Sequence, residues 1–450
     1  MPTSPRRPRR PPLAAQIQAL LARLHFYGGL LVAPFILLAA LTGGLYAMSP
    51  SIESFVYRSV LEVPASAEQV PLQAQILAAQ QTHPDLTVAQ IWPSDRPGDP
   101  TRILFNDPGI EADEQRAVFV DPGTGRVIGD LPSYSGLGEL PLRRWVSGLH
   151  ENLHLGEPGF VYSELAASWL WFLVLGGTFL WWRSVRRRKR KLRGPIPRML
   201  RGLPSKKGSR LRAMNLHAIT GSVVAVVLIG LSLTGITWSN TAGKSVNTIV
   251  AEMNWKATPI ATKVSAAETV PLDTAGQATR VLQTARAEGL TGPLRLYPPT
   301  AMDGGWKASE LWVPGRVASD QISVAGATGR TIARQDFGDL PTFSKLSSWG
   351  IYLHMGTMFG LPLQITLLAV AMAIVAIVVL GYRMWWKRRP TRGGMGTALG
   401  TWKAVGWPVR IGALVIALPI GWLLPYWAFS LALFIAIDAA IQVSKRPKLS

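Results

Sequence analysis

The stretch Gly148-Leu-His-Glu-Asn-Leu-His-Leu-Gly-Glu-Pro-Gly159 determines how the whole chain is interpreted. It holds two of the six histidines and comes directly before a long apolar run. Its centre, His150-Glu-Asn-Leu-His154, matches the H-E-x-x-H pattern of zinc peptidases. In those enzymes two histidines on one face of a helix bind zinc and the glutamate acts as a base. Taken alone, the stretch predicts a zinc site, whereas the rest of the chain favours another chemistry.

Long apolar blocks make up much of the 450-residue chain, in which 48% of the residues are hydrophobic. A helix needs about 20 apolar residues to cross the roughly 30 Å hydrocarbon core of a membrane. Blocks of that length lie at 24–47, 160–182, 213–238 and 361–386. A last block, 409–443, is too long for one span and is broken by a proline, so it predicts a hairpin of two helices. The sequence therefore predicts six spans in a lipid bilayer.

Basic residues are concentrated between these blocks. Of the 47 Lys and Arg residues, 28 lie in four segments without any Asp or Glu, namely 1–23, 183–212, 387–410 and 444–450. The long segment 48–159 has 7 basic and 15 acidic residues, and 239–353 has 11 basic and 9 acidic residues. By the positive-inside rule the four basic segments, including both termini, are expected in the cytoplasm and the two long segments outside. The net charge of +21 is thus an orientation signal, and no nucleic-acid partner is expected.

The expected organisation follows from these blocks and charges. In order, it is a cytoplasmic N-terminus 1–23, span 24–47, outer segment 48–159, span 160–182, cytoplasmic loop 183–212, span 213–238, outer segment 239–360, span 361–386, cytoplasmic loop 387–408, hairpin 409–443 and cytoplasmic tail 444–450. The chain contains no cysteine, which excludes disulfides, thiolate metal sites, iron–sulfur clusters and covalently attached haem.

The chain contains the same unit twice. A shift of 192 residues pairs Leu24, His25, Gly29, Thr42 and Gly43 with Leu216, His217, Gly221, Thr234 and Gly235. A shift of 204 residues pairs Thr124, Gly125, Arg126, Trp145, His150, Gly156, Pro158, Gly177, Trp181 and Trp182 with Thr328, Gly329, Arg330, Trp349, His354, Gly360, Pro362, Gly381, Trp385 and Trp386. Each copy therefore consists of a span, an outer domain, a short membrane-proximal segment and a second span.

Each outer segment predicts a small α+β domain. Val70-Pro-Leu72 and Val270-Pro-Leu272 each mark the start of a helix, because proline is favoured early in helices. Alternating segments predict strands at 87–92, 101–106, 116–120 and 126–128, and at 293–297, 308–313, 321–325 and 330–332. Asp121–Gly125 and Ala325–Gly329 supply the turn between the last two strands of each copy. The expected fold class is a membrane α-helical bundle of four core spans plus a C-terminal two-helix hairpin, with two duplicated α+β domains.

Four of the six histidines form two repeat-related pairs. His25 and His217 each begin an outward-running span, whereas His150 and His354 each lie just outside an inward-running one. A span of about 22 residues rises about 33 Å, so the two pairs are expected near opposite faces of the membrane. They cannot share one ligand.

The pair His25 and His217 fits the needs of a b-type haem, which takes two neutral imidazoles from facing helices as axial ligands. Gly29 and Gly221 lie one turn further along the same helical faces, where their missing side chains leave room for a flat macrocycle. The alternative is that both histidines are interfacial and that the glycines only let helices pack closely.

Several patterns together resemble the PepSY-associated transmembrane helix family over residues 20 to about 390. They are L-H-x-x-x-G with a later T-G, an outer domain ending in T-G-R, L-H before a G-x-P turn, and the exit G-x-x-x-W-W-[RK]. Members of that family include bacterial inner-membrane ferric-siderophore reductases that carry two haems. The resemblance implies two b-type haems with His25, His217, His150 and His354 as iron ligands, in an inner-membrane protein with periplasmic PepSY-like domains.

The resemblance also implies a function. Electrons would pass from a cytoplasmic or membrane donor to a periplasmic ferric siderophore, whose oxygen donors hold Fe(II) less tightly than Fe(III). The alternative is a non-catalytic membrane sensor or transporter accessory, because PepSY-like domains also resemble modules that bind peptidases.

The zinc-peptidase interpretation competes for the same residues. A third ligand is required downstream, where Glu157 and Glu164 are the nearby acidic candidates. The second copy reads His354-Met-Gly-Thr-Met358 and retains only the first histidine. The loss of the second histidine from the second copy favours His150 as a haem ligand, and His154, one turn away, is the alternative ligand.

Overall fold

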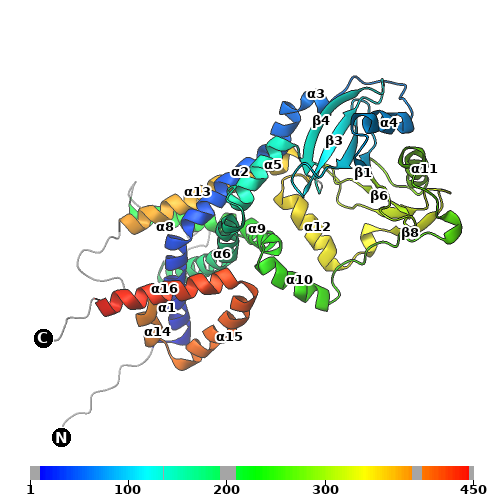
Figure 1. Ribbon diagram of the computed structural model, residues 1–450. Coiled ribbons are helices and arrows are strands. Elements are labelled where there is room, and N and C mark those ends of the chain that lie inside the picture. The colour runs from blue at the N-terminus through cyan, green and yellow to red at the C-terminus, as the bar shows by residue number, and fades with distance from the viewer. Residues whose placement is uncertain (1–10, 135, 193–208, 388–397, 445–450) are drawn as a thin grey trace, which may run out of the picture. The chain divides into compact units, whose positions relative to one another are not determined.

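The computed structural model describes residues 11–134, 136–192, 209–387 and 398–444 (Figure 1). The chain divides into two compact units. The helical unit comprises Met1–Gly44, His150–Val250 and Ala369–Ser450, and the sheet unit comprises Leu45–Leu149 and Ala251–Leu368.

Helices account for most of the described residues. They are α1 (Leu13–Leu31), α2 (Ala33–Val56), α3 (Arg58–Leu61), α4 (Leu72–Thr82), α5 (Pro141–Asn152), α6 (Glu157–Leu192), α8 (Arg210–Val223), α9 (Ala225–Trp238), α10 (Ala242–Glu252), α11 (Thr274–Ala287), α12 (Thr342–His354), α13 (Leu361–Trp386), α14 (Ala398–Ala404), α15 (Trp407–Leu423) and α16 (Pro425–Ser444). The strands are β1 (Thr87–Trp92), β2 (Thr101–Asn106), β3 (Glu114–Val120), β4 (Val127–Tyr134), β5 (Leu294–Tyr297), β6 (Trp306–Glu310), β7 (Gln321–Val324) and β8 (Thr331–Gln335).

Within the described ranges, three helices are long and apolar enough to cross a membrane, namely α2, α6 over Glu157–Arg187, and α13. The pair α8 and α9 passes the same test as one span bent by 63°. The expected hairpin is present as the shorter apolar helices α15 and α16. The chain is therefore a membrane protein with three or four candidate spans, and the count of six stays a prediction.

Both spans that begin with a repeat-related histidine are interrupted. The expected span 24–47 divides between α1 and α2 at Val32, and the expected span 213–238 divides between α8 and α9 at Val224. The two positions are 192 residues apart, the same shift that relates the histidines. Hydropathy does not reveal these breaks, because the apolar character continues through both.

The first break has a clear physical cause. Pro34 has no N–H, so it cannot donate to the carbonyl of Leu30 one turn earlier. The hydroxyl of Tyr382 on α13 donates to that carbonyl instead, at 2.8 Å. A neighbouring helix thus supplies the hydrogen bond that the proline removes, as backbone polar groups in an apolar medium require.

The strands form one antiparallel sheet in the order β4-β3-β2-β1-β5-β6-β7-β8. The two expected α+β domains are therefore not separate, because their first strands, β1 and β5, pair through Ile91 and Leu296. Each copy covers an edge strand that would otherwise present unpaired backbone groups. The expected turns recur in both copies, where Gly125 and Gly329 have φ values of +72° and +77° that favour glycine.

The two sheet halves share one apolar core. Helices α4 and α11 pack side by side on the same face of the sheet (Figure 1). The core includes Ile76 and Ala79 of α4, Ala278 and Val281 of α11, and Ile91, Ile103, Phe105, Leu296, Trp306 and Ile322 of the strands. The two helices together cover the apolar face of both sheet halves, so no second sheet is required to bury it.

The shared core leads to a test on Ile91, whose side chain is fully buried at the join. We expect Ile91→Ala to lower the free energy of opening of the sheet unit by about 2–5 kcal/mol, because it removes buried methyl groups and leaves a cavity. Amide hydrogen exchange should accelerate in β5–β7 as well as in β1–β3. Leu77→Ala, at a residue of α4 that is 46% exposed, is the control and should change little. Acceleration confined to β1–β3 would contradict a common core.

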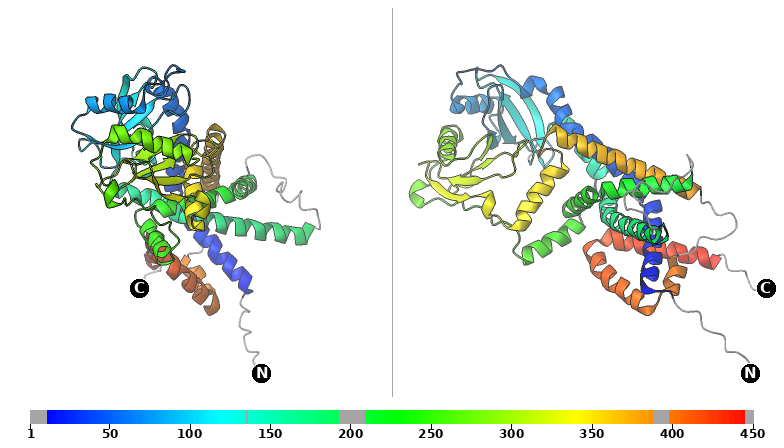
Figure 2. Two further views of the ribbon diagram at one scale, coloured as in Figure 1. Left: turned by 90° about the vertical axis from the view of Figure 1, so that its right-hand side faces the viewer. Right: turned by 180° about the vertical axis from the view of Figure 1, so that it is seen from behind.

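The hairpin is an integral part of the helical unit, where it packs against α1 and α6 (Figure 2). The fully buried Trp169 of α6 donates its indole N–H to the hydroxyl of Ser430 at 2.8 Å. A Cβ on Gly28 would lie 2.7 Å from the Trp169 ring, so only glycine fits there. The hydroxyl of Tyr27 donates to the buried carboxylate of Asp438 at 2.7 Å.

Candidate functional site

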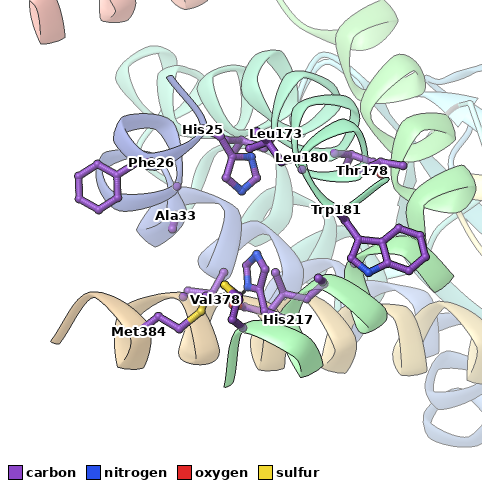
Figure 3. A pocket seen from close by; sticks show the side chains of 18 of the residues that line it. His25, Phe26, Ala33, Leu173, Thr178, Leu180, Trp181, His217, Val378 and Met384 are labelled. Carbon is purple, nitrogen blue, oxygen red and sulfur yellow. Dashed lines mark hydrogen bonds between the residues drawn. The ribbon is translucent and has the colours of Figure 1, made fainter. Parts of the chain in front are cut away.

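A cavity of about 400 Å³ lies in the helical unit between α1, α6, α8 and α13. His25 of α1 and His217 of α8 project into it and point toward one another (Figure 3). Its wall is mainly apolar and includes Phe26, Leu173, Trp181, Val378 and Met384. Cavities of this size that are lined mainly by apolar groups with a few polar ones are typical of ligand and cofactor sites.

The spacing of the two imidazoles fits one metal ion between them. Their ring centres are 6.3 Å apart and their planes are perpendicular. An imidazole nitrogen binds a metal at about 2 Å and lies about 1 Å from its own ring centre, so two axial imidazoles on one iron have centres about 6 Å apart. The structure therefore brings together the two histidines that the sequence paired, at a distance suited to axial ligation.

Backbone carbonyls orient these rings. Nδ1 of His217 donates to the carbonyl of Ile377 on α13 at 2.9 Å. A carbonyl oxygen only accepts, so Nδ1 carries the proton and Nε2 keeps the lone pair that a metal requires. In the first copy, Nδ1 of His25 is buried and faces the carbonyl of Leu173 without meeting hydrogen-bond geometry. Leu173 and Ile377 are related by the 204-residue shift, so each copy presents a carbonyl to its histidine.

Glycines give both rings room. A Cβ on Gly177 would lie 2.9 Å from Cε1 of His25, and a Cβ on its counterpart Gly381 would lie 3.8 Å from Cε1 of His217. Gly29 and Gly221 line the cavity, as the haem interpretation requires. A Cβ on Gly29 would meet nothing within 4 Å, and one on Gly221 would meet only an Ile377 methyl at 3.9 Å.

His150 is also held by partners within the helical unit. Its Nδ1 lies 3.0 Å from the hydroxyl of Thr42, which itself donates to the carbonyl of Leu38 at 2.9 Å. With the hydroxyl proton on that carbonyl, the imidazole donates from Nδ1 and its lone pair lies on Nε2. A Cβ on Gly43 would lie 2.9 Å from Cε1 of His150. Burial lowers the pKa of His150, against the opposing effect of Glu151, and so favours the neutral ring that ligation needs.

The same arrangement thus occurs three times, with a histidine on one helix, a glycine facing its ring from another, and a polar group beside its Nδ1. A family model for the PepSY-associated TM region matches residues 22–388, which include both copies of the repeat. The chain belongs to the PepSY-associated TM region family. No curated protein matches it. The hairpin of α15 and α16 lies outside the matched region of this PepSY-associated protein.

The remaining predicted ligand of this PepSY-associated protein, His354, ends α12 in the sheet unit. His150 belongs to the helical unit. The joint ligation of one haem by these two residues stays a prediction.

The structure does not build a zinc site around the H-E-x-x-H pattern. Helix α5 ends at Asn152, and Leu153 and His154 have φ values of +58° and +56°. His154 is therefore an exposed residue that does not share a helical face with His150. Among the residues that the structure describes, no three His, Asp or Glu side chains form a group suited to a metal ion. His150, unlike His154, lies on a helix beside Thr42 and Gly43, and its role as a haem ligand stays a prediction.

Sequence reasoning missed the residues that position the histidines. Thr42, Gly43 and Gly177 recur in the repeat at the same shifts as the histidines, and this recurrence was the available signal. Their partners lie more than 100 positions away along the chain, so the sequence alone does not connect them.

The contact between Thr42 and His150 gives a specific prediction. Thr42→Val keeps the side-chain shape but removes the acceptor for Nδ1–H, so we expect about 10–100-fold weaker haem retention at the second site. Thr42→Ser keeps the hydroxyl and should retain haem as the native protein does. Transfer of haem to an excess of apomyoglobin measures the effect. Equal retention by the valine and serine variants would show that the hydroxyl does not position His150.

Proposed function

We propose that this protein is a membrane b-type dihaem oxidoreductase that passes electrons from the cytoplasmic side to a periplasmic ferric siderophore and releases Fe(II). The observation that carries the proposal is the pair His25 and His217, whose rings lie 6.3 Å apart in an apolar cavity. Membership of the PepSY-associated family supports it, because some members are ferric reductases.

The residues of the chain have distinct roles in this proposal. His25 and His217 would hold one haem, and His150 and His354 the other. When bound, each haem supplies a one-electron couple between its ferric and ferrous states. Ile377 and Thr42 fix the tautomers of their histidines, and the apolar wall of the first cavity limits the access of water.

Two separate sites fit the helix geometry. Thr42, the partner of His150, follows His25 by 17 positions along α1 and α2, which meet at Val32. At 1.5 Å per residue, 17 positions correspond to a rise of about 25 Å along the two helices, which supports different sites for His150 and His25. Such a separation suits a protein that passes electrons from one face of the membrane toward the other.

The visible spectrum of the full-length protein, purified in detergent from cells supplied with haem, tests this proposal. We expect a Soret band in the oxidised protein and sharp α and β bands after reduction by dithionite. Because the rings of His25 and His217 are perpendicular, the oxidised first site should also give a strongly anisotropic low-spin signal in electron paramagnetic resonance. A colourless, folded protein would overturn the proposal.

A further inference from the structure

Cationic and aromatic side chains gather on the sheet face opposite α4 and α11, at the join of β1 and β5. Residues next to one another in a strand point to opposite faces, and Ile91 and Leu296 face the core. Their strand neighbours therefore face away from it. We call this group the seam cluster, and it comprises Trp92, Arg102, Arg295, Tyr297 and Lys307.

The strand register places these side chains next to one another. Trp92 pairs with Arg102 across β1 and β2, and the join brings Arg295 beside Trp92. The two guanidinium carbons lie 5.2 and 4.3 Å from the centre of the Trp92 ring, which thus has a cation on both sides. Lys307 pairs with Tyr297, and its Nζ lies 4.1 Å from the centre of that ring. The seam cluster therefore consists of side chains from both copies of the repeat.

The three cations lack close acidic partners. Within the part of the chain that the structure describes, no carboxylate lies within 4 Å of Arg102, Arg295 or Lys307, whereas Arg286 nearby pairs with Asp95 at 2.8 Å. The two outer segments together carry six more acidic than basic residues. The seam cluster is therefore a local positive site on an acidic pair of domains.

The longer-range carboxylates act on Arg102. Glu53 and Asp99 act on Arg102 only through space, and Asp99 already pairs with Arg96 at 3.2 Å. Arg102 and Arg295 repel one another. Arg295 and Lys307 keep a positive charge that no close carboxylate of the described residues neutralises, and an anionic ligand on this face would neutralise it.

Most hydrogen-bond donors of the cluster remain available. Arg295 uses Nη1 for the carbonyl of Gly136 at 2.9 Å and for the hydroxyl of Tyr297 at 3.2 Å, while its Nε is buried without a partner among the described residues. Arg102 donates to the carbonyl of Gly138 at 3.4 Å. A guanidinium has five N–H donors, so Arg295 keeps its Nη2 donors for a ligand. The guanidinium of Arg102 is instead largely buried, with its carbon 5.0 Å from the centre of the Phe119 ring, and contributes charge to the site.

The cluster is also close to the helix that carries a proposed haem ligand. Tyr352 of α12 stacks on Trp312 with ring centres 4.5 Å apart and interacts electrostatically with Arg295. His354 follows two residues later at the end of α12. A chelate bound at the cluster would lie beside this helix, all within the sheet unit.

We propose that the seam cluster binds the electron acceptor, and that this acceptor is a ferric catecholate chelate of net negative charge. Catecholate oxygens accept charge-assisted hydrogen bonds from arginine and lysine, the groups that Arg295 and Lys307 offer on this face. A neutral or cationic trihydroxamate chelate lacks the negative charge that these groups would bind. The inference rests on the proposed reductase function for the role of the bound chelate.

Binding of redox-inert gallium(III) chelates to the full-length protein tests the cluster separately from reduction. We expect a gallium tricatecholate of charge −3 to bind at least tenfold more tightly than a neutral gallium trihydroxamate in calorimetry, with the difference falling as salt rises. Lys307→Gln should weaken tricatecholate binding about tenfold, and Lys307→Arg should restore it. Arg295→Gln should have a similar or larger effect. Arg126→Gln, at an exposed turn outside the cluster, is the matched control and should bind as the native protein does.

The outcomes separate the two proposals. Equal affinity for both gallium chelates, or unchanged tricatecholate binding in Lys307→Gln and Arg295→Gln, overturns the seam cluster even if the protein reduces iron. Selective tricatecholate binding by a protein without haem keeps the seam cluster as a binding site and overturns the reductase function. Loss of binding in Arg126→Gln as well would attribute the effect to general charge and would contradict the site.

Discussion

His217→Ala should reduce the haem content of the purified protein from two haems per chain to one. The alanine removes the imidazole that faces His25 across the cavity, so a haem held by this pair would keep only one protein ligand. The Soret absorbance per chain should fall by about half, and His25→Ala should have the same effect because both residues serve one site. A pyridine haemochrome assay against protein concentration measures the content.

Two controls make this test specific. His83→Ala removes a histidine that pairs with Asp130 at 2.7 Å in the sheet unit and has no counterpart in the repeat, so it should leave both haems. Imidazole added to His217→Ala should restore the low-spin spectrum of the first site, which a purely structural role of His217 would not allow. Two haems in both cavity variants would show that His25 and His217 are not the ligands.

Gly177→Ala should weaken haem retention at the first site about 10–100-fold. The added Cβ would lie 2.9 Å from Cε1 of His25, a distance that forces the ring or the helix to move, and such overpacking costs about 1–3 kcal/mol. His25 would then leave the position at which its ring stands 6.3 Å from that of His217. The rate of haem transfer to apomyoglobin measures the loss.

The chain offers matched controls for this substitution. A Cβ on the adjacent Gly176 would lie 3.9 Å from Nδ1 of His25, and one on Gly381 would lie 3.8 Å from Cε1 of His217. Both are ordinary contacts, so Gly176→Ala and Gly381→Ala should retain haem as the native protein does. If all three alanine variants lose haem alike, helix packing in general and not the position of His25 explains the effect.

Much of the fold follows from periodicity and repeats. Alternating residues predict strands such as 87–92 and 101–106, which the structure has within the same bounds. The long apolar block 361–386 coincides with α13. These features are local, because each depends on residues that are close in the sequence.

Contacts between residues far apart in the sequence, and breaks within an apolar span, are harder to predict from the sequence. Nothing in the alternation of β1 or β5 shows that Ile91 pairs with Leu296, because an edge strand and a central strand with one buried face have the same pattern. The break at Val224 is hidden for a similar reason, since it interrupts hydrogen bonding without changing hydropathy.

The sequence predicts part of the candidate site. Duplication singled out His25 and His217, because a random histidine does not recur with a glycine four positions later. The groups that orient the rings come from other helices, such as Ile377 for His217 and Thr42 for His150. Their roles depend on how the helices pack, which the spacing of residues along one helix does not specify.

The most direct test of the whole account is anaerobic reoxidation of the dithionite-reduced, full-length protein by a ferric chelate, followed in the α band with an Fe(II) indicator present. We expect two haems per chain, reoxidation of both, and one Fe(II) released for each electron lost. A protein that binds haem but stays reduced in the presence of ferric chelates would contradict the reductase function. A protein that binds no haem would contradict the site and favour a non-catalytic membrane sensor.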